Sequence, residues 1–230
     1  MTESICNLVV VAHPDDEILG FGATGAKLAA RGEIVQPVIL CGDVDARTQR
    51  PSNDELALDI AAANAKAGFQ QPVLGSFPNI RMNTVGHLDL VQFIEAQIDR
   101  FKPARIFTHH PADLNDDHSQ VAHACLPAAR LSQRRGDLRS APSVYFMEIP
   151  SATDWAFPSG QDMFTPTIFT DITDHLETKL TALECYRNVP RPFPHPRSRD
   201  AISALAAHRG AQSGVGHAEA FQAVFQREFS

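Results

Sequence analysis

The sequence predicts an α/β fold: a doubly wound, mainly parallel sheet with helices on both faces. Two observations lead to this prediction. Short runs of β-branched residues alternate with amphipathic helical segments through the first half of the chain, and polar residues follow these runs at their carboxyl ends. Ligands of such sheets bind beyond the carboxyl ends of the strands. We therefore expect a functional site at that edge of the sheet.

The first half contains the clearest elements. Ser52 and Glu55 have the spacing of a capping box, and Gly68 suits the end of the helix that follows them. The other elements show either a short apolar run or apolar residues at helical spacing. In chain order we predict a strand at 8–12, a helix at 16–31, a strand at 35–40, helices at 52–68 and 91–101, and a strand at 105–108.

The second half is less regular. After Pro127 we predict a strand at 144–148, a loop at 151–165, a helix at 176–186, a segment rich in proline and arginine at 188–199, and short helices at 200–207 and 218–228. The chain shows no internal repeat, low-complexity tract or linker. We therefore expect residues 1–230 to form one domain.

The composition excludes several classes of function. A net charge of −7 argues against a nucleic-acid or anionic-membrane partner. No secretory leader and no apolar run of about 18 residues is visible, so we expect a cytoplasmic protein without a membrane insertion. The cysteines are far apart and form no C-x-x-C pair, which favours free thiols over disulfides. The partner we expect is a small molecule, and a homo-oligomer stays possible.

The segment His13-Pro14-Asp15-Asp16 follows the first predicted strand and opens the first helix. His13 and Asp16 offer an imidazole and a carboxylate on a tight turn, and zinc takes such ligands. Asp15 lies between them and can accept the proton of a water that a metal has activated. The alternative is that both aspartates cap the helix, a position that aspartate favours.

A second polar cluster, residues 108–118, follows the third predicted strand. It holds three histidines and three aspartates in eleven residues, which is unusual for a solvated loop. His118, near the start of the next helix, supplies the third ligand that a catalytic zinc site requires. Asp117 is placed to hold a neighbouring group by a hydrogen bond.

These two segments resemble the LmbE-like, or PIG-L, family of zinc-dependent N-deacetylases. That family carries A-H-P-D-D-E after its first strand, which residues 12–17 match in full, and a later H-x-D-H, which residues 115–118 match except at the first position. The resemblance implies a Rossmann-like fold, His13, Asp16 and His118 as zinc ligands, and Asp15 as general base. It implies hydrolysis of an acetamide on an amino sugar or glycoconjugate. Ligand type alone does not distinguish Zn²⁺ from Fe²⁺.

One position departs from the family pattern. The first histidine of its later segment, thought to steady the oxyanion or protonate the leaving amine, is Asn115 here. Asparagine can donate a hydrogen bond to an oxyanion, but it cannot give up a proton at neutral pH. The candidate proton donors are therefore His110, His195 and Asp15 after it has taken a proton.

Further segments suggest residues that bind the substrate. Arg81 follows the short apolar run at 72–74, a further predicted strand, and can hold a hydroxyl, carboxylate or phosphate group. Arg47 follows the strand predicted at 35–40 and can also face the pocket. His195 and Arg197 belong to a P-H-P-R-S segment, in which prolines fix the backbone. A subgroup of the family that the two motifs resemble carries such a segment near its C-terminus. Trp155 can offer an aromatic platform to a sugar ring. The alternatives are surface arginines, a rigid connection and ordinary packing.

Three rival functions stay open at this point. Residues 20–25 read G-x-G-x-x-G, but the dinucleotide-binding fingerprint needs its first glycine at the end of the strand, and here the glycines fall inside the helix. Close packing of the helix on the sheet explains them better than a nucleotide-dependent oxidoreductase does. A zinc hydrolase of another amide or an ester is the second rival. A sugar-binding relative weakened by Asn115 is the third.

Overall fold

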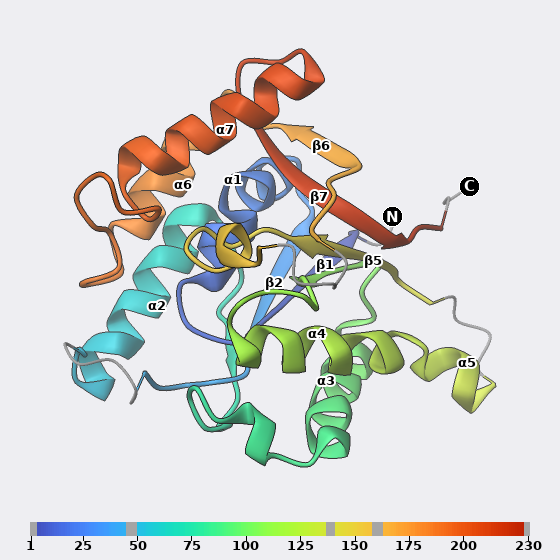
Figure 1. Cartoon of the computed structure of the whole chain (residues 1–230). Helices are drawn as coiled ribbons and strands as arrows, with labels where there is room; N and C mark the ends of the chain where they lie inside the picture. Colours follow the sequence, from blue (N-terminus) through green and yellow to red (C-terminus); the bar gives the residue numbers. More distant parts are fainter. Residues whose placement is uncertain (1–3, 45–49, 137–140, 158–162, 228–230) are drawn as a thin grey trace.

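The computed structural model describes residues 4–44, 50–136, 141–157 and 163–227 (Figure 1). Among these residues, strands form one sheet in the order β3-β2-β1-β4-β5-β7-β6. The first five in this order are parallel, and β7 pairs antiparallel with both β5 and β6. The strands are β1 (Cys6–Val11), β2 (Ile34–Ile39), β3 (Val73–Leu74), β4 (Arg105–His109), β5 (Ser143–Met147), β6 (Ile168–Asp171) and β7 (Ala218–Phe225).

Helices cover both faces of the sheet, as Figure 1 shows. One apolar core joins the sheet to α1, α2, α6 and α7, and a second core joins its other face to α3 and α4. The helices are α1 (Asp16–Ala30), α2 (Asn53–Ala67), α3 (His87–Phe101), α4 (Asp116–Ala129), α5 (Leu131–Arg135), α6 (Leu176–Leu183) and α7 (Arg199–Ser213), with 3₁₀ turns η1 (Met82–Thr84) and η2 (Thr153–Trp155). No helix within the described ranges is long and apolar enough to cross a membrane.

Strand β1 shows why the sequence pattern revealed a doubly wound sheet. Val9 and Val11 belong to the core on the α1 side, whereas Leu8 and Val10 belong to the core on the α3 side. Because both faces are covered, the strand is a continuous apolar run rather than an alternation. The predicted capping box is also present: Ser52 and Glu55 exchange hydrogen bonds at the start of α2.

The predicted helix at 218–228 is wrong, because residues 218–225 form strand β7. Alanine, glutamate and glutamine favour helix by intrinsic propensity. Here pairing with β5 and β6 on both sides overrides that preference. The helix predicted at 200–207 is present but longer, as α7.

The glycines of helix α1 serve close packing, as expected. A Cβ atom on Gly20 would lie 2.6 Å from the sulfur of Met147, and one on Gly25 would lie 2.4 Å from the ring of Phe69. A side chain from outside the helix also binds its backbone: the N–H groups of Ala23 and Thr24 donate to the carboxylate of Glu219, at 3.2 and 2.7 Å. This region of α1 is structural, and no nucleotide is needed to explain it.

Candidate metal centre

The sheet brings the two polar segments together. Strand β1 ends at Val11 and α1 begins at Asp16, while β4 ends at His109 and α4 begins at Asp116. Since β1 and β4 are parallel neighbours, both turns lie at the same edge of the sheet. Residues 97 to 105 positions apart therefore come within hydrogen-bond distance there.

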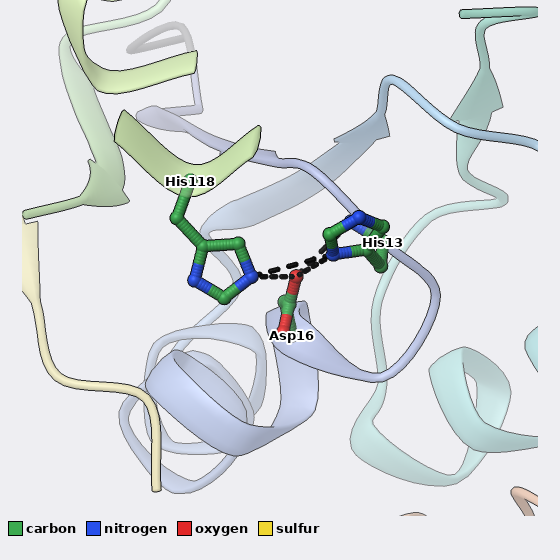
Figure 2. A group of neighbouring side chains, drawn as sticks. All are labelled: His13, Asp16 and His118. Atoms are coloured by element: carbon green, nitrogen blue, oxygen red, sulfur yellow. Dashed lines mark hydrogen bonds and ion pairs between the residues drawn. The ribbon is translucent and has the colours of Figure 1, made fainter. Parts of the chain in front are cut away.

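His13, Asp16 and His118 converge on one point, as Figure 2 shows. Asp16 Oδ2 lies 3.3 Å from His13 Nδ1 and 3.2 Å from His118 Nε2, and the two imidazole nitrogens are 3.3 Å apart. A tetrahedral zinc with ligands at about 2.0–2.1 Å separates its ligand atoms by about 3.3–3.4 Å. The three donor atoms therefore fit a single zinc-sized cation.

Carboxylates hold the outer nitrogens of both histidines. His13 Nε2 lies 2.9 Å from Asp117 Oδ2, and His118 Nδ1 lies 3.2 Å from Asp113 Oδ2. Asp117 is itself fixed by the backbone N–H groups of Ile80 and Met82, at 2.6 and 2.9 Å. Metal-binding histidines are usually oriented in this way, which supports the assignment of a metal site. The expectation that Asp117 holds a neighbouring group is confirmed.

The charges of the three side chains depend on one another. Burial lowers the pKa of His118, but Asp16 and Asp113 outweigh burial and raise this pKa to about 10. Burial also lowers the pKa of His13, and Asp117 with Asp16 raises it above its usual value. Burial alone would raise the pKa of Asp16, yet the histidines hold it well below the ordinary range. A cation bound here would displace protons from both imidazoles.

His109 also lies in the cluster, although the sequence analysis did not select it. Its ring stacks on that of His118 at 3.8 Å and 14°, and its Nε2 accepts the backbone N–H of Ala12 at 2.9 Å. The signal in the sequence was its position at the carboxyl end of a predicted strand, and the structure adds which way it faces. Side chains alternate along a strand, and Phe107, two residues earlier in β4, packs on Phe21 of α1. His109 therefore faces the same side as the start of α1.

Asp15 occupies an unusual backbone conformation between the ligands. Its φ is 103°, its side chain is buried, and it makes no side-chain cap to α1 although it holds the N-cap position. Its carboxylate Oδ2 lies 3.2 Å from the guanidinium of Arg197, whose Nε donates to Ser151 at 2.8 Å. The alternative that Asp15 serves as a helix cap is therefore not supported, and the P-H-P-R-S segment reaches the metal motif.

Glu17, the last residue of A-H-P-D-D-E, is fully buried beside Asp15. Its Oε2 accepts the backbone N–H of Asp15 at 3.1 Å. Its Oε1 accepts the side-chain amide of Asn64, at 3.0 Å, and the hydroxyl of Tyr186. Burial raises the pKa of Glu17 to about 7, although the hydrogen bond from Tyr186 opposes this effect.

The candidate proton donors lie around the cluster in different settings. Asn115 is the N-cap of α4, because its Oδ1 accepts the N–H of Asp117 at 3.1 Å. His110 is buried, accepts the N–H of Ala112 at Nδ1, and packs edge-on against Phe146 and Phe164. His195 is half-buried, and its Nδ1 accepts the N–H of Arg197 at 3.0 Å. Burial and the nearby arginines lower the pKa of His195.

The remaining predicted residues lie further out. Arg81 is exposed, on the segment whose neighbours Ile80 and Met82 hold Asp117. Trp155 is 55% exposed at the end of η2 and packs edge-on against Phe157. Arg47 lies outside the described residues.

A cavity of about 490 Å³ lies between helix α7 and the segments that follow strand β5. It is lined largely by apolar and aromatic side chains, among them Phe157, Phe164, Pro194, Pro196 and Ala201. Thr153, also in its wall, donates its hydroxyl to Asp113 at 2.9 Å. Pro196 precedes Arg197 in the chain. The wall of the cavity is therefore linked to Asp113 by a hydrogen bond and to Arg197 along the chain.

Comparison with known proteins identifies the family. The sequence model of the PIG-L family, described as GlcNAc-PI de-N-acetylase, matches residues 8–129, from β1 to the end of α4. The chain belongs to the PIG-L family. The resemblance drawn from the two motifs is thus confirmed. A similar protein is the uncharacterized deacetylase YaiS of Escherichia coli strain K12, 29% identical over 193 residues, which are 79% of this chain and 90% of YaiS.

Solved structures share the fold along nearly the whole chain. The conserved protein TT1542 of Thermus thermophilus has a TM-score of 0.75 at 23% identity, with 97% of this chain and 96% of that chain covered. GalB, the 4-carboxy-2-hydroxymuconate hydratase of Pseudomonas putida KT2440, scores 0.79 at 21% identity, with 98% of each covered. N,N'-diacetylchitobiose deacetylase of Pyrococcus horikoshii scores 0.74 at 17% identity, with 96% and 84% covered. The predicted fold class is confirmed.

Proposed function

We propose that this protein is a zinc-dependent N-deacetylase that removes an acetyl group from an amino sugar or glycoconjugate and releases acetate. The observation that carries the proposal is the convergence of His13, Asp16 and His118 at 3.2–3.3 Å, in a chain of a deacetylase family. The buried Asp15 lies next to Asp16 in the chain. Together these residues provide the ligands and the base that amide hydrolysis at a metal requires.

A zinc ion in this site would polarise the acetamide carbonyl and lower the pKa of a water molecule to about 7. The residues of the chain supply the rest of the chemistry. Asp15 accepts the proton of the attacking water, and the guanidinium of Arg197 holds its carboxylate in place. Arg197, at 3.2 Å from Asp15, also adds a positive charge where the carbonyl oxygen becomes negative.

Proton transfer to the leaving amine is assigned to His195 or to Asp15. The Nδ1 of His195 accepts a backbone N–H, so its Nε2 carries the proton of the neutral ring. Asp15 holds a proton after the water has attacked. Asn115 uses its Oδ1 as a helix cap, which leaves its amide nitrogen as the donor that it offers to an oxyanion.

The cavity of the second half, whose wall is linked to Asp113 and Arg197, supports a substrate larger than an acetamide group. Its volume of about 490 Å³ and its aromatic lining suit a sugar ring with a further substituent. Trp155 packs edge-on against Phe157, which lines the cavity. We therefore assign the acetamide to the metal ligands and the rest of the substrate to this cavity, with Arg81 and Arg197 as polar contacts.

The test combines metal analysis with acetate release. Purified protein is analysed for zinc and iron, and acetate is measured with a panel of free, nucleotide-linked and lipid-linked N-acetyl amino sugars. We expect Asp15→Ala to retain metal and to lose turnover by about 10²–10⁴-fold, since it removes the base. We expect His13→Ala to lose metal. Wild-type turnover by Asp15→Ala on an identified substrate would show that the mechanism is wrong.

The same experiment separates the rival functions. A structure that shares this fold belongs to a hydratase, so the panel also includes an unsaturated carboxylic acid, whose hydration is followed by loss of absorbance. Turnover of that acid without acetate release from any sugar would favour a hydratase. Release of another acid would indicate a different amide or ester. Sugar binding by zinc-loaded protein without acetate release would indicate a binding protein.

A further inference from the structure

Asp15 holds a backbone conformation that an aspartate rarely adopts. Its φ of 103° lies in the region that favours glycine, and its side chain is fully buried. Such a conformation persists only where neighbouring groups fix it, and it is found most often at active sites.

Glu17 makes the contact that fixes this turn. The backbone N–H of Asp15 donates to Glu17 Oε2 at 3.1 Å, two residues along the chain. The other oxygen of Glu17 is held by Asn64 from α2, at 3.0 Å, and by the hydroxyl of Tyr186, which follows α6. Two other parts of the chain, α2 and the segment after α6, therefore position the Glu17 carboxylate against the peptide of Asp15.

The stability of the fold does not explain why this carboxylate is buried. Glu17, Asn64 and Tyr186 are each at most 1% exposed. Taking a carboxylate out of water is costly, and replacing a buried polar network by apolar side chains often leaves a protein equally stable or more stable. A buried polar network at this position therefore points to a role in the site that it adjoins.

We propose that Glu17 is a positioning residue for Asp15. It fixes the peptide of Asp15 in its positive-φ conformation, so that the carboxylate is held in place to accept a proton, and Asn64 and Tyr186 fix Glu17 in turn. This inference rests on the proposed role of Asp15 as the base. It adds a residue that acts through Asp15 and touches neither metal nor substrate.

Glu219, in strand β7, provides a matched control that contacts the same helix. It too is a buried carboxylate that accepts backbone N–H groups of α1, those of Ala23 and Thr24, and it pairs with Lys179 at 2.7 Å. It contacts the middle of α1, whereas Glu17 contacts its beginning. A purely structural effect of losing a buried carboxylate should therefore be the same for both residues.

The experiment measures kcat, KM, metal content and melting temperature for Glu17→Leu, Glu17→Gln and Glu219→Gln. We expect Glu17→Leu to lower kcat by about 100-fold with KM and metal unchanged, since a misplaced base slows the chemistry without weakening binding. Glu17→Gln keeps an oxygen that can accept the Asp15 N–H, so its kcat should fall by only about tenfold. Glu219→Gln should lower the melting temperature and leave kcat unchanged.

Wild-type kcat in metal-loaded Glu17→Leu, or an equal fall of kcat in Glu219→Gln, would overturn the proposal. If Glu17→Leu does not fold, Glu17→Gln decides by itself: a lower kcat at unchanged KM supports the proposal, and an unchanged kcat overturns it. Amide hydrogen exchange gives a readout that needs no substrate: the Asp15 N–H should exchange slowly in the wild type and faster in Glu17→Leu, which has no acceptor for this N–H. Unchanged exchange would overturn the inference, whereas no acetate release by the wild type would overturn only the proposed function.

Discussion

The two halves of the molecule contribute differently to the site. The first half, up to α4, supplies the proposed metal ligands, which are almost inaccessible: His13 is 5% exposed, and Asp16 and His118 are 1% exposed. The second half supplies half-buried and exposed residues around them, such as His195, Arg197 and Trp155. The proposed metal site is thus built on the edge of the sheet, and the surface that we propose to meet the substrate is built on loops.

Contacts between the halves follow one pattern. Three side chains of the second half bind carboxylates of the first half: Arg197 binds Asp15, Thr153 binds Asp113, and Tyr186 binds Glu17. None of these carboxylates is a proposed metal ligand. The comparison therefore suggests that the first half binds the metal by itself, while the second half orients the groups around it. Substitutions on each side test this division.

The largest effect is expected from Asp117→Ala, which changes the first half alone. Asp117 holds His13 at 2.9 Å and is fixed by two backbone N–H groups. Without it His13 is free to rotate, so we expect the affinity for zinc to fall by about 10–100-fold. Competition with a fluorescent chelator measures this affinity. The control is Asp116→Ala, since Asp116 is exposed at the preceding position. Equal affinities for the two variants would contradict the proposed ligand set.

A smaller effect is expected from Arg197→Ala, which removes a contact between the halves. We expect kcat/KM to fall by about 30-fold with metal content unchanged, because a hydrogen bond between charged groups contributes about 1.5–3 kcal/mol. Arg197→Lys should recover only part of the lost kcat/KM, since an ammonium cannot reach Ser151 and Asp15 in the same geometry. The control is Arg199→Ala, whose guanidinium binds Glu177 and Glu184 at the surface. Loss of metal from Arg197→Ala would break the division between the halves.

Sequence reasoning succeeded where the relevant residues are close in the chain. His13, Asp15 and Asp16 share one turn, and the buried parallel strands show as apolar runs. It failed where distant pairing decides the outcome. Strand β7 has a helical composition and becomes a strand only through its neighbours. Arg197 and Asp15 are 182 positions apart, and no local pattern shows that they meet.

The smallest effect is expected from filling the cavity of the second half. Ala201 lines this cavity from the first turn of α7, whereas Ala204 is exposed on the same helix. Ala201→Phe should raise KM for a substrate with a large substituent by about fivefold, equivalent to about 1 kcal/mol, and leave kcat and metal content unchanged. Ala204→Phe should change none of these values. An unchanged KM in Ala201→Phe would place the substrate elsewhere, and a fall in kcat would mean that this wall reaches the reacting atoms, so that the two halves are not separable there.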